Sequence, residues 1–262
     1  MKKSAISSGT DLQNLHAVVT GGGTGIGAEI AVRLAELGMR VTVMGRRQDP
    51  LETTCARLGE AQAVCVDISD PDSVKAAFTS AVNHFGPVSV LVNNAGNAVS
   101  APFEKIALGD WQTVLAVNLT GTFLCTQQVL SGMREKGWGR VINIASSAGL
   151  KGYSHVASYC AAKHGIIGLT RSLALEVARD GITINSVCPG YTDTEMMNQA
   201  LNNIVEKTGR TREEALKQLT RLNPQGRLVQ PAEVAAAVSW LCLPNSDAMT
   251  GQSIPVACGE VM

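Results

Sequence analysis

A tyrosine and a lysine four positions apart form the most reactive pair in the sequence. Tyr159 and Lys163 lie one turn apart on a predicted helix over 159–177, and so on one face of it. A phenol normally titrates near pH 10, but a neighbouring ammonium favours the phenolate. Ser146 follows a predicted strand over 141–144, and its hydroxyl could fix an alcohol or carbonyl oxygen. The pattern predicts proton exchange with such an oxygen, although a Tyr and a Lys at this spacing are also common on helix surfaces.

A polar side chain interrupts the apolar helix predicted around 111–133. Asn118 stands between Val117 and Leu119, where asparagine is a poor helix former. A buried amide needs hydrogen-bond partners, and it could hold a water that feeds protons to Lys163. The alternative is a structural polar residue without a role in chemistry.

The glycine-rich segment over 20–27 joins the first predicted strand to the first predicted helix. Such a turn lets backbone N–H groups approach a pyrophosphate, whose charge the helix N-terminus stabilises. Its spacing, TGxxxGxG, differs from the GxGxxG dinucleotide fingerprint. The residues expected to contact a dinucleotide here are Gly21, Gly23, Thr24, Gly25, Ile26 and Gly27.

Two arginines follow the second predicted strand, over 41–44. An NAD-binding chain would place a carboxylate here for the ribose hydroxyls, but Arg46 and Arg47 stand at this point. Arginine can bind a 2′-phosphate, so NADP(H) is the preferred cofactor. Asp49 is close enough to leave NAD(H) open, and the alternative is a pair of solvated surface arginines.

Polar and small residues also end the third and fourth predicted strands. Asp67 ends one, and Asn93-Asn94-Ala95-Gly96 ends the other. The carboxyl ends of parallel strands border the ligand crevice, where small residues leave room for a nucleotide. Turn formation alone could also explain these residue types.

The elements that must position these residues alternate between strand and helix, and no linker divides the chain. This order predicts an α/β fold: a single-domain, Rossmann-type, doubly wound parallel sheet of about seven strands with helices on both faces. We expect a tail over 1–14 and the folded domain over 15–262. Two helices over about 194–222 are expected to form a substrate lid, the alternative being an ordinary surface helix pair.

Composition excludes several classes of function. Among 262 residues, 22 Lys and Arg balance 22 Asp and Glu, so nucleic acid and membrane are unlikely partners. The seven cysteines include no CxxC or Cys/His cluster, which predicts free thiols and no metal site. The N-terminus lacks the apolar core of a secretory signal, so we expect a cytoplasmic protein.

Taken together, these motifs resemble the short-chain dehydrogenase/reductase family over nearly the whole chain. The resemblance implies that Tyr159 donates the proton and Ser146 orients the substrate oxygen. It implies that Lys163 holds the nicotinamide ribose and lowers the tyrosine pKa, while Asn118 supports a proton relay. It also implies a homotetramer and further cofactor contacts near adenine, ribose and carboxamide, at Asp67, Ile68, Asn94, Ala95, Gly96, Pro189, Gly190, Thr192 and Thr194.

Within that family, residues 133–146, 211–215 and 226–231 look like those of aromatic polyketide ketoreductases and 3-oxoacyl-thioester reductases. The resemblance implies NADP(H)-dependent hydride transfer to or from a ketone or secondary alcohol, most simply a 3-oxoacyl thioester on CoA or a carrier protein. The alternatives are a dehydrogenase of free cyclic, steroid-like or polyol alcohols, and a catalytically silent dinucleotide-binding sensor or scaffold.

Three smaller expectations concern the surroundings of the site. Tyr153 and His155 could line the substrate pocket, although a plain loop histidine fits His155 equally well. The chain departs from the usual Gly-Gly after the final strand, where it reads Cys258-Gly259-Glu260. Weak candidates for a basic patch that docks a carrier protein are Arg134, Lys136 and Arg140.

Overall fold

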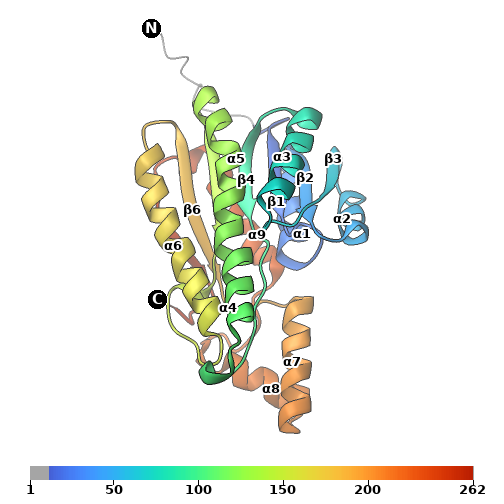
Figure 1. The fold of residues 1–262 in the computed structure, drawn as a ribbon, viewed down its shortest axis with the longest axis vertical. Helices are drawn as coiled ribbons and strands as arrows, with labels where there is room; N and C mark the ends of the chain where they lie inside the picture. Colours follow the sequence, from blue (N-terminus) through green and yellow to red (C-terminus); the bar gives the residue numbers. More distant parts are fainter. Residues whose placement is uncertain (1–11, 262) are drawn as a thin grey trace.

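Seven parallel strands form one sheet in the order β3-β2-β1-β4-β5-β6-β7 (Figure 1). The computed structural model describes residues 12–261. The predicted sheet is thereby confirmed. Its strands are β1 (His16–Thr20), β2 (Arg40–Gly45), β3 (Ala61–Cys65), β4 (Val88–Asn93), β5 (Gly139–Ile144), β6 (Ile182–Pro189) and β7 (Ser253–Val256).

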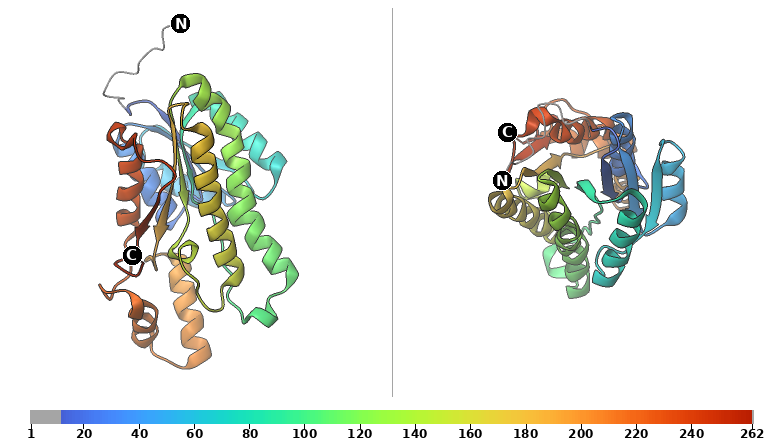
Figure 2. Two further views of the ribbon diagram at one scale, coloured as in Figure 1. Left: turned by 90° about the vertical axis from the view of Figure 1, so that its left-hand side faces the viewer. Right: turned by 90° about the horizontal axis from the view of Figure 1, so that it is seen from above.

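Helices cover both faces of the sheet, as a doubly wound fold requires (Figure 2). The pair α1 and α9 packs on one face, and α3, α5 and α6 pack on the other. The α-helices are α1 (Gly25–Glu36), α2 (Gln48–Cys55), α3 (Pro71–Phe85), α4 (Leu108–Leu115), α5 (Gly121–Lys136), α6 (Ala157–Val177), α7 (Glu195–Thr208), α8 (Arg212–Leu219) and α9 (Pro231–Cys242).

The central strands are apolar because both of their faces are covered. Every residue of β1, β4, β5 and β6 is buried, and about half of these residues are Val, Ile or Leu. The neighbours β1 and β4 lie where the strand order reverses, so their following segments diverge to opposite faces. This divergence opens the crevice in which doubly wound sheets bind ligands.

The helix predicted around 111–133 is interrupted by a π-helical turn. Ala116–Thr120 forms this turn between α4 and α5, and Asn118 lies at its centre. A π-turn inserts an extra residue into the helix and is often found at functional sites. Apolar periodicity does not reveal such an insertion, so the sequence indicated one continuous helix.

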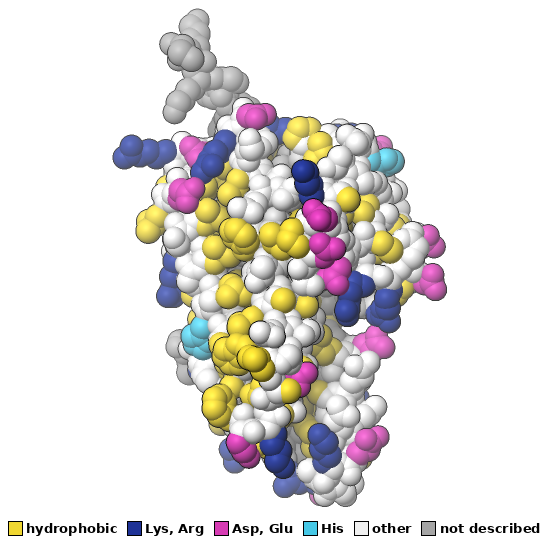
Figure 3. Space-filling model, viewed as in Figure 1, with side chains coloured by type: hydrophobic (Ala, Val, Ile, Leu, Met, Phe, Trp, Pro, Cys, Tyr) yellow, Lys and Arg dark blue, Asp and Glu magenta, His cyan; other side chains and the backbone are white. Residues whose placement is uncertain are grey.

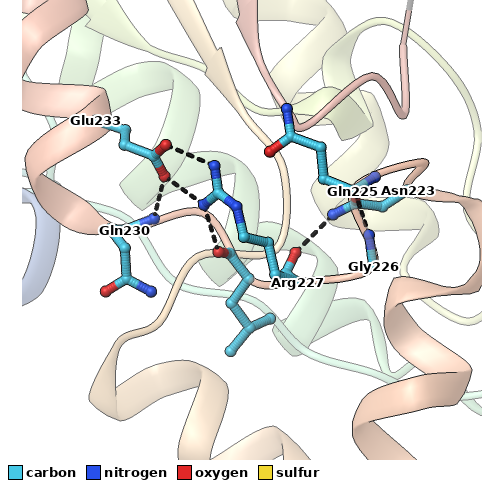
Figure 4. A network of polar contacts seen from close by, with 7 residues as sticks. Asn223, Gln225, Gly226, Arg227, Gln230 and Glu233 are labelled. Carbon is cyan, nitrogen blue, oxygen red and sulfur yellow. Dashed lines mark hydrogen bonds and ion pairs between the residues drawn. The ribbon is translucent and has the colours of Figure 1, made fainter.

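The two helices predicted over about 194–222 are present as α7 and α8, followed by a 3₁₀ turn over Thr220–Leu222 (Figure 1); we call this segment the lid, and its role over a substrate stays a prediction. It extends beyond the carboxyl edge of the sheet. A polar network fixes the chain where it leaves the lid for α9 (Figure 4): Arg227 donates to both carboxylate oxygens of Glu233, each at 2.7 Å, and Asn223 Nδ2 donates to the Arg227 carbonyl. The lid is therefore joined to the domain by a fixed connection.

The predicted tail over 1–14 falls mostly outside the described residues. Its last part, residues 12–14, contacts the rest of the domain. Leu12 is buried in the core beside α1, and the Asn14 N–H donates to the Gly38 carbonyl at 2.8 Å. Residues 12–14 thus belong to the folded domain, which extends before the predicted boundary at Leu15.

A buried histidine begins β1. His16 Nδ1 lies 2.8 Å from the Gly86 carbonyl and therefore carries a proton, while Nε2 lies 2.9 Å from Thr42 Oγ1. The pKa of His16 is lowered to about 4, chiefly by burial; the charges of Arg40 and Lys136 add to this effect, and the Gly86 hydrogen bond opposes it. The imidazole is thus neutral in the folded protein at neutral pH.

This histidine should make stability fall in mild acid. Between pH 6.5 and about 4 the unfolded chain binds more protons at His16 than the folded protein does, so stability rises with pH in this window. We expect a loss of about 3 kcal/mol in the free energy of unfolding as pH falls through the whole window. Urea unfolding between pH 7.5 and pH 5 measures the loss over the upper part of this window, where carboxylates do not yet titrate. A His16→Gln variant should show a smaller slope, and an equal slope would contradict the assignment.

Candidate active site

The predicted site residues converge at the carboxyl edge of the sheet. All seven strands run the same way, so the segments after β1, β4, β5 and β6 meet at one end. The lid begins at this end as well, because α7 follows β6 (Figure 1). The structure therefore brings together groups that lie far apart in the sequence.

The glycine-rich turn packs closely against the start of α1. Gly21 and Gly25 have φ angles of 65° and 54°, which only glycine adopts easily. A Cβ on Gly27 would lie 2.2 Å from the Gly21 carbonyl oxygen, so no side chain fits there. Thr24 precedes α1, but its side chain makes no capping hydrogen bond. The first N–H groups of α1 are thus not capped by that side chain, which suits an anion site.

Asn94 braces this turn from the end of β4. Its Nδ2 donates to the carbonyl oxygens of Thr20 and Gly21 at 3.0 and 3.1 Å. In return, Thr20 Oγ1 accepts from the N–H groups of Asn94 and Ala95. Asn94 was expected near the cofactor ribose, and the structure places it within the support of the glycine-rich turn.

The residues after β2 and β3 lie on the exposed side of the crevice. Arg46, Arg47 and Asp49 are all exposed. Hydrogen bonds from Ser69 hold the pKa of the Asp67 carboxyl below its usual range, and the charge of Arg46 adds to this effect. Arg46 and Asp67 are therefore neighbours, while the arginine head groups remain accessible to a solvated anion.

The four residues predicted to carry chemistry lie around the ends of β4 and β5. Lys163 is buried, and its Nζ donates to the Ile144 carbonyl at 2.9 Å. The same Nζ lies 5.4 Å from the ring centroid of Tyr159. Ser146 follows β5 and forms a side-chain hydrogen bond with Tyr159. The phenol is thus bordered by a hydroxyl and an ammonium.

The pKa of Tyr159 differs from the expected direction. Burial raises the pKa of this phenol, whereas the Ser146 hydrogen bond lowers it and Lys163 is not among the groups that shift it. Burial also lowers the pKa of Lys163 to about 8, because the ammonium has little solvent. The expectation that Lys163 lowers the tyrosine pKa stays a prediction: burial is the largest influence on this phenol, and the Ile144 carbonyl already binds the Lys163 ammonium.

Asn118 has one free acceptor beside Lys163. Its Nδ2 lies 2.9 Å from Val114 O and from both oxygens of Asn97, so its two protons are shared among three acceptors, whereas its buried Oδ1 has no partner. A Cβ on Gly96 would lie 2.7 Å from this Oδ1 and 3.6 Å from Lys163 Nζ. Sequence reasoning missed Asn97, and its position directly after the Asn-Asn-Ala-Gly run was the only signal.

The segment after β6 crosses the crevice from the other side. Gly190 N–H donates to the Val256 carbonyl, and Thr192 Oγ1 donates to Gly190 O. Thr194 caps α7 through Met197 N–H, and its Cγ2 would lie 3.2 Å from a Cβ on Gly25. The start of α7 therefore faces the glycine-rich turn, and the cofactor contacts predicted for this segment stay a prediction.

The two residues suggested for the substrate pocket differ in their surroundings. Tyr153 is half-buried, and its hydroxyl lies 2.7 Å from both Ser147 Oγ and Glu260 Oε1. His155 is exposed, and its carbonyl accepts from the Ala101 N–H. Tyr153 is thus part of a network beside Ser146, whereas His155 is a loop residue.

Of the basic patch suggested for a carrier protein, Arg140 is wrong because it is buried, whereas Arg134 and Lys136 are exposed and stay a prediction, although both have partners within the domain. Arg140 is buried under Trp138 and pairs with Asp247. Lys136 donates to Pro87 O and Ser89 Oγ, and Arg134 pairs with Glu176 and Asp180.

Three further observations concern residues 12–261. No helix there is long and apolar enough to cross a membrane. This part of the chain contains no group of three or more His, Cys, Asp or Glu side chains that could bind a metal ion. All seven cysteines are free, and Cys125, Cys188 and Cys242 are buried.

The close packing of the glycine-rich turn yields a stability prediction. Gly27→Ala should lower the free energy of unfolding by about 1–3 kcal/mol, because its methyl group overlaps the Gly21 carbonyl. Gly109→Ala is the matched control, since a Cβ there meets nothing within 4 Å and alanine favours the helix. Urea unfolding compares the two variants. Equal stability of both would show that the turn can relax away from α1.

Comparison with known proteins agrees with this geometry. The short chain dehydrogenase family model matches residues 15–204. A Streptomyces coelicolor protein with the provisional name ketoacyl reductase is 43% identical over 93% of this chain and 95% of its own length. The acetoacetyl-CoA reductase of Cupriavidus necator is 38% identical over 90% of this chain and 93% of its own length.

The solved structures include a close neighbour. A crystal structure of an actinorhodin polyketide ketoreductase variant with NADPH superimposes with a TM-score of 0.91 at 41% identity, and it covers 96% of this chain and 98% of its own. Sequence, fold and site geometry agree, and the chain belongs to the short chain dehydrogenase family.

Proposed function

We propose that this protein transfers hydride between NADP(H) and a ketone or secondary alcohol, with a 3-oxoacyl thioester as its substrate. The observation that carries the proposal is the convergence of Tyr159, Ser146 and Lys163 at one end of the crevice. These are the groups needed to donate a proton to a carbonyl oxygen, to hold that oxygen, and to supply charge beside it.

The residues present fit a dinucleotide. The turn from Gly21 to Gly27 offers backbone N–H groups at the start of α1, and Gly96 leaves a space bordered by Asn118 Oδ1 and Lys163 Nζ. Exposed Arg46 and Arg47 suit a 2′-phosphate. When bound, the nicotinamide would supply the hydride or accept it.

The protein's own groups carry the accompanying proton. In the reducing direction the Tyr159 hydroxyl gives its proton to the substrate oxygen, while the Ser146 hydroxyl donates a hydrogen bond to the same oxygen. The Lys163 ammonium favours the phenolate formed in that step, and its pKa of about 8 lets it exchange protons near neutral pH. The free Oδ1 of Asn118 can accept from a water that returns the proton.

The substrate class rests on the relatives. The Cupriavidus necator protein is named for acetoacetyl-CoA and the Streptomyces coelicolor protein for a ketoacyl group. Met196 and Leu222 are exposed apolar residues on the lid, which suit an acyl chain. The proposal includes both CoA and a carrier protein as the group to which the thioester joins the acyl chain.

Assembly and location stay predictions. We propose a cytoplasmic homotetramer that packs through α4, α5 and α6, where Leu108, Phe123 and Leu175 are exposed. Hydrophobic side chains gather over the face formed by α5 and α6 (Figure 3). Sedimentation velocity measures the assembly, and a monomer at micromolar concentration would contradict it.

Loss of one hydroxyl should separate catalysis from binding. Tyr159→Phe should lower kcat by about 10² to 10⁴, because it removes the proton donor. NADPH binding, followed by cofactor fluorescence, should change little. Unchanged turnover would refute the assignment of Tyr159, and a wild-type protein that binds NADPH without turnover on any ketone would support the silent sensor.

A substrate and cofactor panel tests the remaining parts. Oxidation of NADPH and of NADH is followed by absorbance with acetoacetyl-CoA and with free cyclic ketones of similar size. We expect rapid NADPH oxidation with the thioester, and Arg46→Ala should weaken NADPH binding about tenfold or more while leaving NADH binding unchanged. Turnover on cyclic ketones alone would contradict the thioester proposal. A preference of the wild-type protein for NADH would contradict the role of Arg46.

A further inference from the structure

A buried carboxylate lies beside the loop that joins two of the proposed catalytic residues. Glu260 follows β7, and only 1% of its side chain is exposed. Its N–H donates to the Ala257 carbonyl at 2.9 Å, across a turn in which Cys258 and Gly259 have φ angles of 52° and 85°. A positive φ is uncommon for a residue such as Cys258, so the turn that presents Glu260 is strained.

The Glu260 carboxylate is linked to two residues of that loop. Its Oε1 lies 2.7 Å from the Tyr153 hydroxyl and 3.2 Å from Lys151 Nζ. Lys151 also donates to the backbone carbonyl of Glu260. The segment after β7 is therefore attached to the loop between β5 and α6 by three polar contacts.

Proton counting gives these contacts a direction. A carboxylate paired with Lys151 can only accept, so Tyr153 donates its single proton to Glu260. The Tyr153 oxygen must then accept from the Ser147 hydroxyl, 2.7 Å away. The result is a chain of hydrogen bonds from Ser147 through Tyr153 to Glu260.

Ser147 begins the 3₁₀ turn that orients Ser146. Within this turn, Ala148 N–H donates to Ser146 Oγ at 3.1 Å, and Gly149 N–H donates to the Ser146 carbonyl at 2.9 Å. Fixing the Ser147 side chain therefore fixes the turn that holds the Ser146 hydroxyl. The anchor lies after β7, more than a hundred residues further along the chain.

The burial of Glu260 is costly. Its second oxygen, Oε2, is buried without a hydrogen-bond partner and would lie 3.3 Å from a Cβ on Gly190. An incompletely paired buried carboxylate destabilises a fold, whereas an exposed pair such as Arg33–Glu36 costs little. Stability therefore does not explain why the fold buries the Glu260 side chain, and this burial needs another explanation.

We propose that Glu260 is a positioning residue that acts through Tyr153 and Ser147 to hold the Ser146 hydroxyl at the reacting oxygen. This inference rests on the proposed function and adds a residue to its site. It also gives a role to the position where the chain departs from the Gly-Gly of the family pattern.

The pH profile reports such positioning. The Ser146 hydrogen bond lowers the pKa of Tyr159, so a displaced Ser146 should raise that pKa. The other groups that face Tyr159 are Lys163 and Cys160 on α6 and Cys188 on β6, and those that face Glu260 are Lys151, Tyr153 and Tyr191. A general loss of stability would leave the pH midpoint of kcat in place.

The experiment measures kcat against pH for oxidation of 3-hydroxybutyryl-CoA with NADP. Glu260→Ala and Tyr153→Phe should each lower kcat about tenfold. In this direction kcat rises with pH as Tyr159 loses its proton, and both variants should shift the midpoint of that rise to higher pH by about half a unit or more. The double variant should be no worse than the poorer single variant, because both changes break one chain. Glu260→Gln should recover most of kcat, since its amide oxygen can accept from Tyr153. Glu36→Gln, in the exposed pair, is the matched control and should match the wild type.

A second readout needs no turnover. Amide hydrogen exchange over residues 147–156 should be faster in Glu260→Ala and Tyr153→Phe than in the wild type and in Glu36→Gln. Faster exchange with an unchanged pH midpoint, or unchanged exchange, overturns the positioning role while the proposed function stands. A wild-type protein without turnover on any ketone overturns the proposed function and this inference together.

Discussion

The hydrogen bonds between Thr20 and the segment after β4 are the interaction on which the site depends. They join β1 and β4 at the point where the two halves of the sheet diverge. Asn94 also donates to the Gly21 carbonyl, so the segment after β4 holds the glycine-rich turn against α1 as well. Hydrogen bonds thus hold the backbone at the base of the crevice in place.

Burial of Tyr159 and Lys163 governs the chemistry of the site. Burial lowers the pKa of Lys163 to about 8 and raises the pKa of Tyr159, so both groups move toward their neutral forms. The protein offsets this effect with hydrogen bonds: Ile144 O binds the ammonium, and Ser146 binds the phenol. A small displacement of Ser146 would therefore change the pKa of Tyr159. For this reason the turn after β5 needs an anchor such as Glu260.

Local patterns predicted those features that depend on neighbours in the chain. Alternating apolar runs indicated the sheet, and the Tyr-Lys spacing placed two functional groups on one face of α6. The π-turn around Asn118 escaped prediction, because an inserted residue leaves the surrounding apolar pattern helical. The burial of Arg140 escaped prediction for a different reason: its partner Asp247 lies far away in the sequence.

Residue types and their spacing were sufficient for the strands and helices, the glycine-rich turn and the placing of Tyr159 and Lys163 on one helix face, because each of these rests on backbone geometry within one element or one turn. Long-range packing set the rest. The pKa of Tyr159 depends on burial, which arises when α6 packs against β6 and the turn after β5. The partner of Tyr153 is a carboxylate from the end of the chain. Spacing along the sequence does not encode such contacts, since they form when the parallel strands bring their carboxyl ends to one edge.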